Sequence, residues 1–215
     1  MSPPPPSGEG GQTGLVWIVY LVLVVVLLVG TTALAKRLRR LWAFMYVPLL
    51  LLACISGDWL LRNLEFEDLV TATEASEAPL HRWNREIHQI LDRGVDSYES
   101  ETVWLEVMRQ TARERHHNLL VATNDVEQVR VAPWHFSITR AQQSYERHGQ
   151  AWSEHLGEWT AFVGPDLPTA DGEIKASFDI AENDFLDALT LFPRFDLRSR
   201  VEDIFSERVL RLVTT

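Results

Sequence analysis

Two long apolar runs dominate the N-terminal part of this chain. Residues 14–35 and 41–61 are predominantly aliphatic and aromatic, and only the short segment 36–40 separates them. At about 1.5 Å of rise per residue, a helix of either length reaches roughly 30 Å, the thickness of the hydrocarbon core of a bilayer. The pattern therefore predicts a transmembrane hairpin of two antiparallel helices. Residues 1–13, rich in Pro, Gly and Ser, predict a disordered tail before it.

The charges that flank these runs predict the orientation of the hairpin. Cytoplasmic loops of membrane proteins hold an excess of Lys and Arg. The segment between the two runs carries four basic side chains, whereas the tail carries none; the four are Lys36, Arg37, Arg39 and Arg40. We therefore expect the loop 36–40 in the cytoplasm and both termini on the extracytoplasmic side. The predicted localisation is integral to the cell membrane, with the lipid bilayer as a partner.

The sequence after the second run predicts a helical bundle over residues 62–163. Its clearest pattern places apolar and aromatic side chains at alternating steps of three and four, which is a heptad repeat. The members of the repeat are Ile138, Ala141, Tyr145, His148, Trp152, His155, Trp159 and Phe162. Polar residues between them, Gln142 among these, indicate a solvated opposite face. Two shorter stripes predict partner helices: Leu80, Trp83, Ile87, Ile90 and Leu91, and then Trp104, Met108, Ala112, Leu119 and Ala122.

The C-terminal part predicts more helix together with a small exception. Residues 164–172 form a turn-rich connector, and residues 173–215 continue the same domain as a helical subregion. Two stretches alternate with period two, residues 129–138 and residues 174–180. Such alternation predicts a minor two-stranded β element. The expected fold class is mainly α, with the hairpin followed by the bundle domain.

Charge and cysteine content narrow the possible partners of this domain. The chain has 20 basic and 30 acidic residues, of which 4 and 2 lie in residues 1–61, so the remainder carries 16 against 28, or −12. Phosphate binding needs the opposite field, and nucleic acid is not expected as a partner. The single cysteine, Cys54, lies in the second apolar run. The domain is therefore held together without disulfides.

Two histidines of the heptad repeat, His148 and His155, are the first candidates for chemistry. Most partly buried histidines simply form a hydrogen bond with a neighbour. An imidazole among aromatic rings also loses solvation when it is charged, so both residues are candidates for pH sensing. A third interpretation is a metal or haem site inside the bundle. The sequence leaves these three interpretations open.

A Glu-x-x-His spacing adds Glu114 and His117 to the metal candidates. This spacing places both side chains on one helical face, as in di-iron carboxylate bundles. Those sites need two copies and further glutamates, and this chain has one copy. Chance is the simpler explanation in an acidic domain with seven histidines. We predict no cofactor.

Two functional hypotheses follow from this organisation. The first is a membrane-anchored, non-enzymatic interaction module: a sensor, a scaffold or an accessory subunit of a membrane or envelope complex. A hairpin with only a five-residue cytoplasmic loop has to pass any signal through partner helices, so this hypothesis predicts a membrane-protein partner or a homo-oligomer. The alternative is a metal-dependent or acid/base enzyme that acts on an envelope component through the bundle histidines. The sequence favours the first.

Overall fold

The computed structural model describes the chain as a set of helices in two compact units, residues 1–66 and residues 67–215. The described residues are 22, 24–26, 29–30, 41–163, 168, 172–189 and 195–206. Their helices are α2 (Leu41–Arg93), the 3-10 helix η1 (Val95–Ser97), α3 (Glu101–Glu127), α4 (Phe136–Ala161), α5 (Gly172–Leu189) and α6 (Phe195–Ile204). These residues contain no strand, so the predicted mainly α class is confirmed.

The first unit contains the N-terminal part of α2. The tail, most of the first apolar run and the basic loop with Lys36, Arg37, Arg39 and Arg40 lie outside the described residues. The second apolar run is helical as the beginning of α2. Across the described residues, no helix combines the length and the apolarity that crossing a membrane requires.

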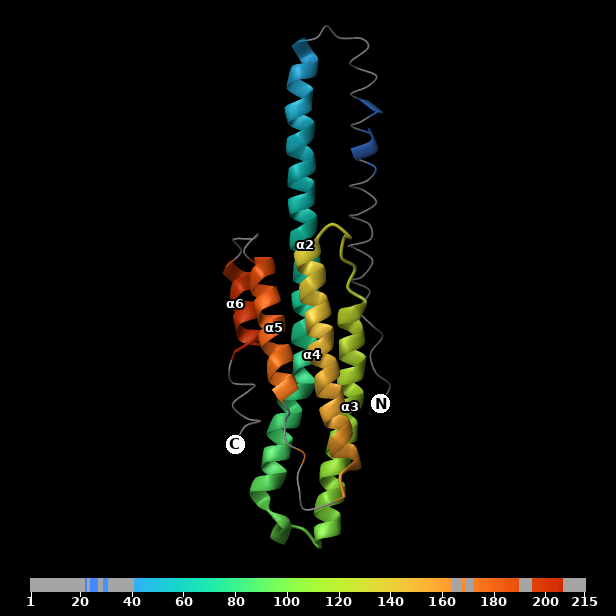
Figure 1. Cartoon of the computed structure of the whole chain (residues 1–215), viewed down its shortest axis with the longest axis vertical. Helices are drawn as coiled ribbons and strands as arrows, with labels where there is room; N and C mark the ends of the chain where they lie inside the picture. Colours follow the sequence, from blue (N-terminus) through green and yellow to red (C-terminus); the bar gives the residue numbers. More distant parts are fainter. Residues whose placement is uncertain are drawn as a thin grey trace. The chain divides into compact units, whose positions relative to one another are not determined.

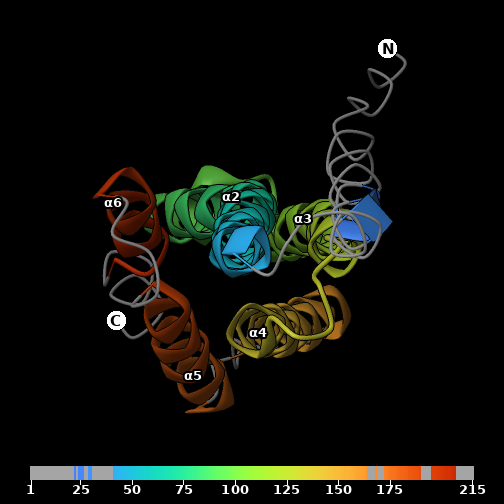
Figure 2. The same cartoon turned by 90° about the horizontal axis from the view of Figure 1, so that it is seen from above.

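The second unit is a helical bundle in which α4 is the central element. In both views α4 lies between α3 and α5, and it contacts both of them (Figures 1 and 2). The predicted heptad repeat is confirmed, because every member from Ile138 to Trp159 is buried. The ring of Trp159 meets that of Trp83 of α2 edge to face, with their centroids 5.2 Å apart. The helix predicted from the most regular apolar pattern is therefore the one that organises the core.

The two shorter stripes also face the core. Leu80, Trp83, Ile87 and Ile90 of α2 are buried, and Met108, Ala112 and Leu119 of α3 join them in one cluster with Trp152, Leu156 and Trp159. The helix that carries the first stripe ends at Arg93. Gly94 has a φ of 66° and a ψ of 168°, a backbone conformation that glycine adopts readily, and its N–H bonds to the carbonyl of Leu91 at 3.0 Å.

The predicted β element is wrong. Residues 174–180 belong to α5. Residues 129–135 connect α3 to α4, and residues 136–138 are the first residues of α4. The helical stripe of α5 consists of Ile174, Phe178, Ala181 and Phe185, which are all buried, whereas Ile180, a member of the period-two pattern, is 49 % exposed. Seven residues are too few to separate the two periods, and the buried positions further along α5 decide in favour of the helix.

Gln142 also departs from the sequence analysis, which placed it on a solvated face. It is 8 % exposed, and its side-chain amide nitrogen, Nε2, donates to the carbonyls of Val126 at 2.8 Å and Val129 at 3.1 Å. A third contact reaches the carbonyl of Glu127 at 3.3 Å. Because the last carbonyls of a helix have no partner within that helix, this amide of α4 caps the C-terminus of α3.

We expect Gln142→Met to destabilise the protein by about 1–3 kcal/mol, because it keeps the length of the side chain but removes the amide donor that three carbonyls at the end of α3 share. Gln143→Met makes the same change at the exposed neighbouring position and is expected to be nearly neutral. Denaturant unfolding of the full chain measures both. Equal effects at the two positions would show that the cap contributes nothing.

Gly149 marks a close approach of α4 to α3. A Cβ at this position would lie 2.9 Å from both Cγ2 and Oγ1 of Thr123. A Cβ at Gly157, two turns further along α4, would meet no atom within 4 Å. The absence of a side chain at Gly149 therefore permits the contact between the two helices.

The two glycines provide a matched test of this contact. Gly149→Ala is expected to destabilise the protein by about 1–3 kcal/mol, because overpacking outweighs the gain in helix propensity of about 1 kcal/mol. Gly157→Ala gains the propensity without the clash and is expected to stabilise by up to about 1 kcal/mol. Thermal or denaturant unfolding gives both values. Stabilisation by both alanines would contradict the close approach.

Candidate functional site

The two heptad histidines lie inside the bundle, and each has a hydrogen-bond partner. Nδ1 of His148 lies 3.0 Å from Oγ of Ser177, a residue of α5. Burial lowers the pKa of His148 to about 4, against an opposing effect of the backbone carbonyl of Ile174. His155 accepts a hydrogen bond at Nε2 from Nε1 of Trp159, at 3.1 Å. The hydrogen-bonded core histidine is thus the arrangement that both positions adopt.

The aromatic ring of Trp152 lies between these two histidines on α4. Its centroid is 6.5 Å from that of His148 and 5.8 Å from that of His155. The other metal candidates, Glu114 and His117, are exposed on α3, where Glu114 accepts a hydrogen bond from Gln110 at 3.0 Å. Within the described ranges, no group of three or more His, Cys, Asp or Glu side chains is arranged to hold a metal ion.

A buried acid that the sequence analysis did not single out forms the most unusual site of the bundle. Glu77 of α2 is 3 % exposed, and its Oε1 lies 2.7 Å from the hydroxyl of Tyr145 on α4. The Tyr145 hydroxyl also contacts Oγ of Ser76, which donates to the backbone carbonyl of Thr73 at 2.9 Å. Oε2 of Glu77 is buried without a hydrogen-bond partner. We call these four residues the Glu77 cluster.

Burial determines the electrostatics of the Glu77 cluster. Loss of solvent raises the pKa of Glu77 to about 7, although the hydrogen bond with Tyr145 lowers it. Burial also raises the pKa of Tyr145 well above its ordinary value, and the negative charge of Glu77 adds to this effect. A carboxyl group that changes its charge near neutral pH in a protein core is a candidate functional group.

The number of available protons also favours a neutral Glu77. Ser76 has one hydroxyl proton, and the carbonyl of Thr73 can only accept it. When Glu77 is ionised, Tyr145 donates to its Oε1, and the contact between Ser76 and Tyr145 is left without a proton. When Glu77 is neutral, the carboxyl group can donate to Tyr145, and Tyr145 can donate to Ser76. With Glu77 ionised, two hydroxyl protons have to serve three contacts. The complete chain of hydrogen bonds therefore belongs to the neutral acid.

A sequence signal for Glu77 exists, although it is weak. The apolar stripe that begins at Leu80 extends backwards at helical spacing through Glu77 and Thr73 to Leu69, and all four side chains are buried. Read on the sequence, Glu77 belongs to an acidic segment with Glu74. The tertiary structure separates the two, since Glu74 forms a bidentate ion pair with Arg200 of α6, at 2.7 and 2.6 Å.

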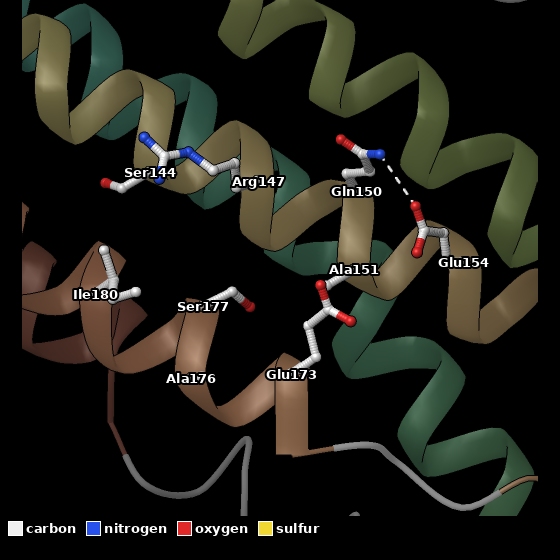
Figure 3. Close-up of a pocket in the computed structure, with 9 residues that line it drawn as sticks. All are labelled: Ser144, Arg147, Gln150, Ala151, Glu154, Glu173, Ala176, Ser177 and Ile180. Atoms are coloured by element: carbon white, nitrogen blue, oxygen red, sulfur yellow. Dashed lines mark hydrogen bonds between the residues drawn. The ribbon is translucent and has the colours of Figure 1, made fainter.

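A groove of about 420 Å³ lies between α4 and α5 (Figure 3). Arg147, Gln150 and Glu154 line it from α4, and Glu173 and Ser177 line it from α5. In Figure 3 the side chain of Ser177 extends towards α4. Because Ser177 also bonds to His148, one wall of the groove is connected to the buried polar groups.

This arrangement defines the chain as a helical bundle with ionisable groups in its core. No protein-family model, curated protein or solved structure matches the chain.

Proposed function

We propose that this chain is a two-pass membrane protein whose residues 62–215 form an extracytoplasmic interaction domain. The proposed spans are residues 14–35 and 41–61, with the loop 36–40 in the cytoplasm. The domain acts without catalysis, as a sensor, scaffold or accessory subunit of a membrane complex. Its partner is a second membrane protein or a second copy of the chain.

The burial of the ionisable side chains in the bundle is the observation that supports this proposal most. The side chains of Glu77, Tyr145 and His148 are at most 3 % exposed. Each one contacts other groups of the bundle, on α2, α4 or α5. A substrate needs reactive groups that it can touch, whereas groups in the core act on the packing of the helices that carry them. The bundle is therefore suited to a conformational role.

Two further features support the membrane anchor and the mode of interaction. The two apolar runs and the four basic residues between them are the sequence pattern of a two-pass anchor. The second run and the first helix of the bundle are continuous in α2, from Leu41 to Arg93. The charge of −12 after residue 61 favours a partner whose facing surface is basic.

The anchor and its orientation can be tested on the whole chain. We expect the protein to remain in the membrane pellet after extraction with alkaline carbonate. An export-dependent phosphatase fused after Thr215 should be active, and a fluorescent protein fused at the same place should be dark. Carbonate-soluble protein would refute the anchor, and the reverse fusion result would refute the orientation.

The interaction itself needs a separate experiment. After extraction in several mild detergents, we expect the chain to elute as an oligomer or together with a second membrane protein. Raising the salt concentration tests the charge complementarity. The complex should weaken as salt screens the acidic surface of the domain. A monomer in every mild detergent would refute the interaction module.

A further inference from the structure

We propose that Glu77 is a proton-binding site that controls the contact between α2 and α4. In the protonated state, the carboxyl group donates to Tyr145, Tyr145 donates to Ser76, and Ser76 donates to the carbonyl of Thr73. Loss of the proton breaks this order and loosens the contact. The inference uses only residues of the second unit, so it does not depend on the proposed membrane anchor.

The geometry of the Glu77 cluster links the protonation of Glu77 to the contact between α2 and α4. Glu77 and Tyr145 belong to different helices, and the 2.7 Å bond between them is buried. When the carboxyl group is neutral, three protons serve the three contacts of the chain. When it is ionised, one contact lacks a proton and a charge lies in the core, with Oε2 unpartnered. Both consequences act on the same helix pair.

The backbone of α2 lacks a hydrogen bond close to Glu77. Pro79 lies inside α2, two residues after Glu77. Because proline has no N–H, α2 lacks the backbone bond that would join residue 79 to the carbonyl of Ala75. The helix is therefore less able to hold this turn on its own, and the side-chain contacts with α4 contribute more to its position.

The groups around Glu77 offer little compensation for a negative charge. Charged or titratable side chains on the elements packed there are Tyr145 and His148 of α4, Glu74 and His81 of α2, and Arg200 of α6. Arg200 is engaged with Glu74, and burial holds the pKa of His148 at about 4. From α5, the apolar ring of Phe185 packs on Tyr145, with their centroids 6.2 Å apart. An ionised Glu77 therefore has no free cation beside it among these groups.

Infrared spectroscopy and hydrogen exchange on the full chain in detergent test both parts. A protonated carboxylic acid has a C=O stretch that a carboxylate lacks. We expect a band of this kind, absent from Glu77→Gln, to disappear as the pH rises through about 7. Over the same interval, exchange of amides around Glu77 and Tyr145 should rise in the wild type relative to Glu77→Gln, by up to roughly 100-fold.

Tyr145→Phe separates the proposed chain from simple burial. It keeps the ring and removes the hydroxyl group that accepts the proton of the neutral acid in the proposed order, so the infrared midpoint should move to lower pH. A shift to higher pH would show that Tyr145 mainly donates to the carboxylate, and would overturn the proposed order. An unchanged midpoint would show that the chain does not pass through Tyr145. A missing band at acidic pH, or exchange that follows Glu77→Gln at every pH, would overturn the proposal. None of these outcomes depends on whether the chain resists carbonate extraction.

Discussion

Replacing Glu77 with glutamine is expected to stabilise the full chain by about 3 kcal/mol near pH 8 and to change its stability little near pH 4.5. Glutamine has the shape of the neutral acid and can still bond to Tyr145. The raised pKa of Glu77, about 7 against 4.5 in the unfolded chain, means that the folded state holds the proton more tightly. Its contribution is fully present below pH 4.5 and is lost as the pH rises through about 7.

Glu74→Gln is the matched control, since it makes the same chemical change one turn earlier on α2. Glu74 is partly exposed and paired with Arg200, so its loss is expected to cost at most about 1 kcal/mol at either pH. Denaturant unfolding at several pH values, in one detergent, measures all three proteins. If Glu77→Gln and wild type have the same pH dependence, the pKa of Glu77 is the same in the folded and unfolded chain, and the raised pKa is refuted.

Replacing His148 with glutamine is expected to produce the opposite pH dependence. Burial lowers the pKa of His148 to about 4, from 6.5, so the unfolded chain takes up the proton first as the pH falls. The wild type should therefore lose about 3 kcal/mol relative to the variant between about pH 6.5 and pH 4. The measurement compares the slopes of the free energy of unfolding with pH. Its absolute values are less informative, because His148→Gln changes the contact with Ser177 at every pH.

His117→Gln is the control for this second series, because it removes an exposed histidine from α3. Its stability should follow that of the wild type within about 0.5 kcal/mol. Parallel curves for His148→Gln and wild type would mean that the pKa of His148 is the same in the folded and unfolded chain. They would also leave the pH-sensing hypothesis for this residue without support.

Glu77 and His148 are both expected to be uncharged in the folded protein between about pH 4 and pH 7. Between about 4.5 and 6.5, stability should rise with pH through His148 and fall through Glu77, with similar slopes. The two contributions to the free energy of unfolding should therefore cancel in the wild type over this interval. Glu77→Gln should reveal the pH dependence that comes from His148, and His148→Gln should reveal the one that comes from Glu77. A small pH dependence in the wild type alone would thus be no evidence against titration in the core.

Long regular patterns were the part of the fold that could be predicted. The heptad repeat from Ile138 to Trp159 spans three repeats, and its buried members share one face of α4. The short alternation over residues 174–180 fits both periods, and it was assigned to the wrong one because the deciding positions, Ala181 and Phe185, lie beyond it. Gln142 was assigned to the solvated face for a related reason. Its buried amide binds the C-terminal end of α3, and the sequence of α4 does not show where α3 ends.

The candidate site shows the same division between local pattern and tertiary contact. The sequence by itself determined that His148 and His155 lie on the buried face of a helix, because periodicity fixes which side chains share a face. Only the tertiary structure decided that Glu77 is buried while Glu74 is paired with Arg200. Both are glutamates of one acidic segment, and a pKa depends on the solvent and partners that neighbouring helices remove or supply. Those neighbours, Tyr145 and Arg200, lie 68 and 126 positions away along the chain.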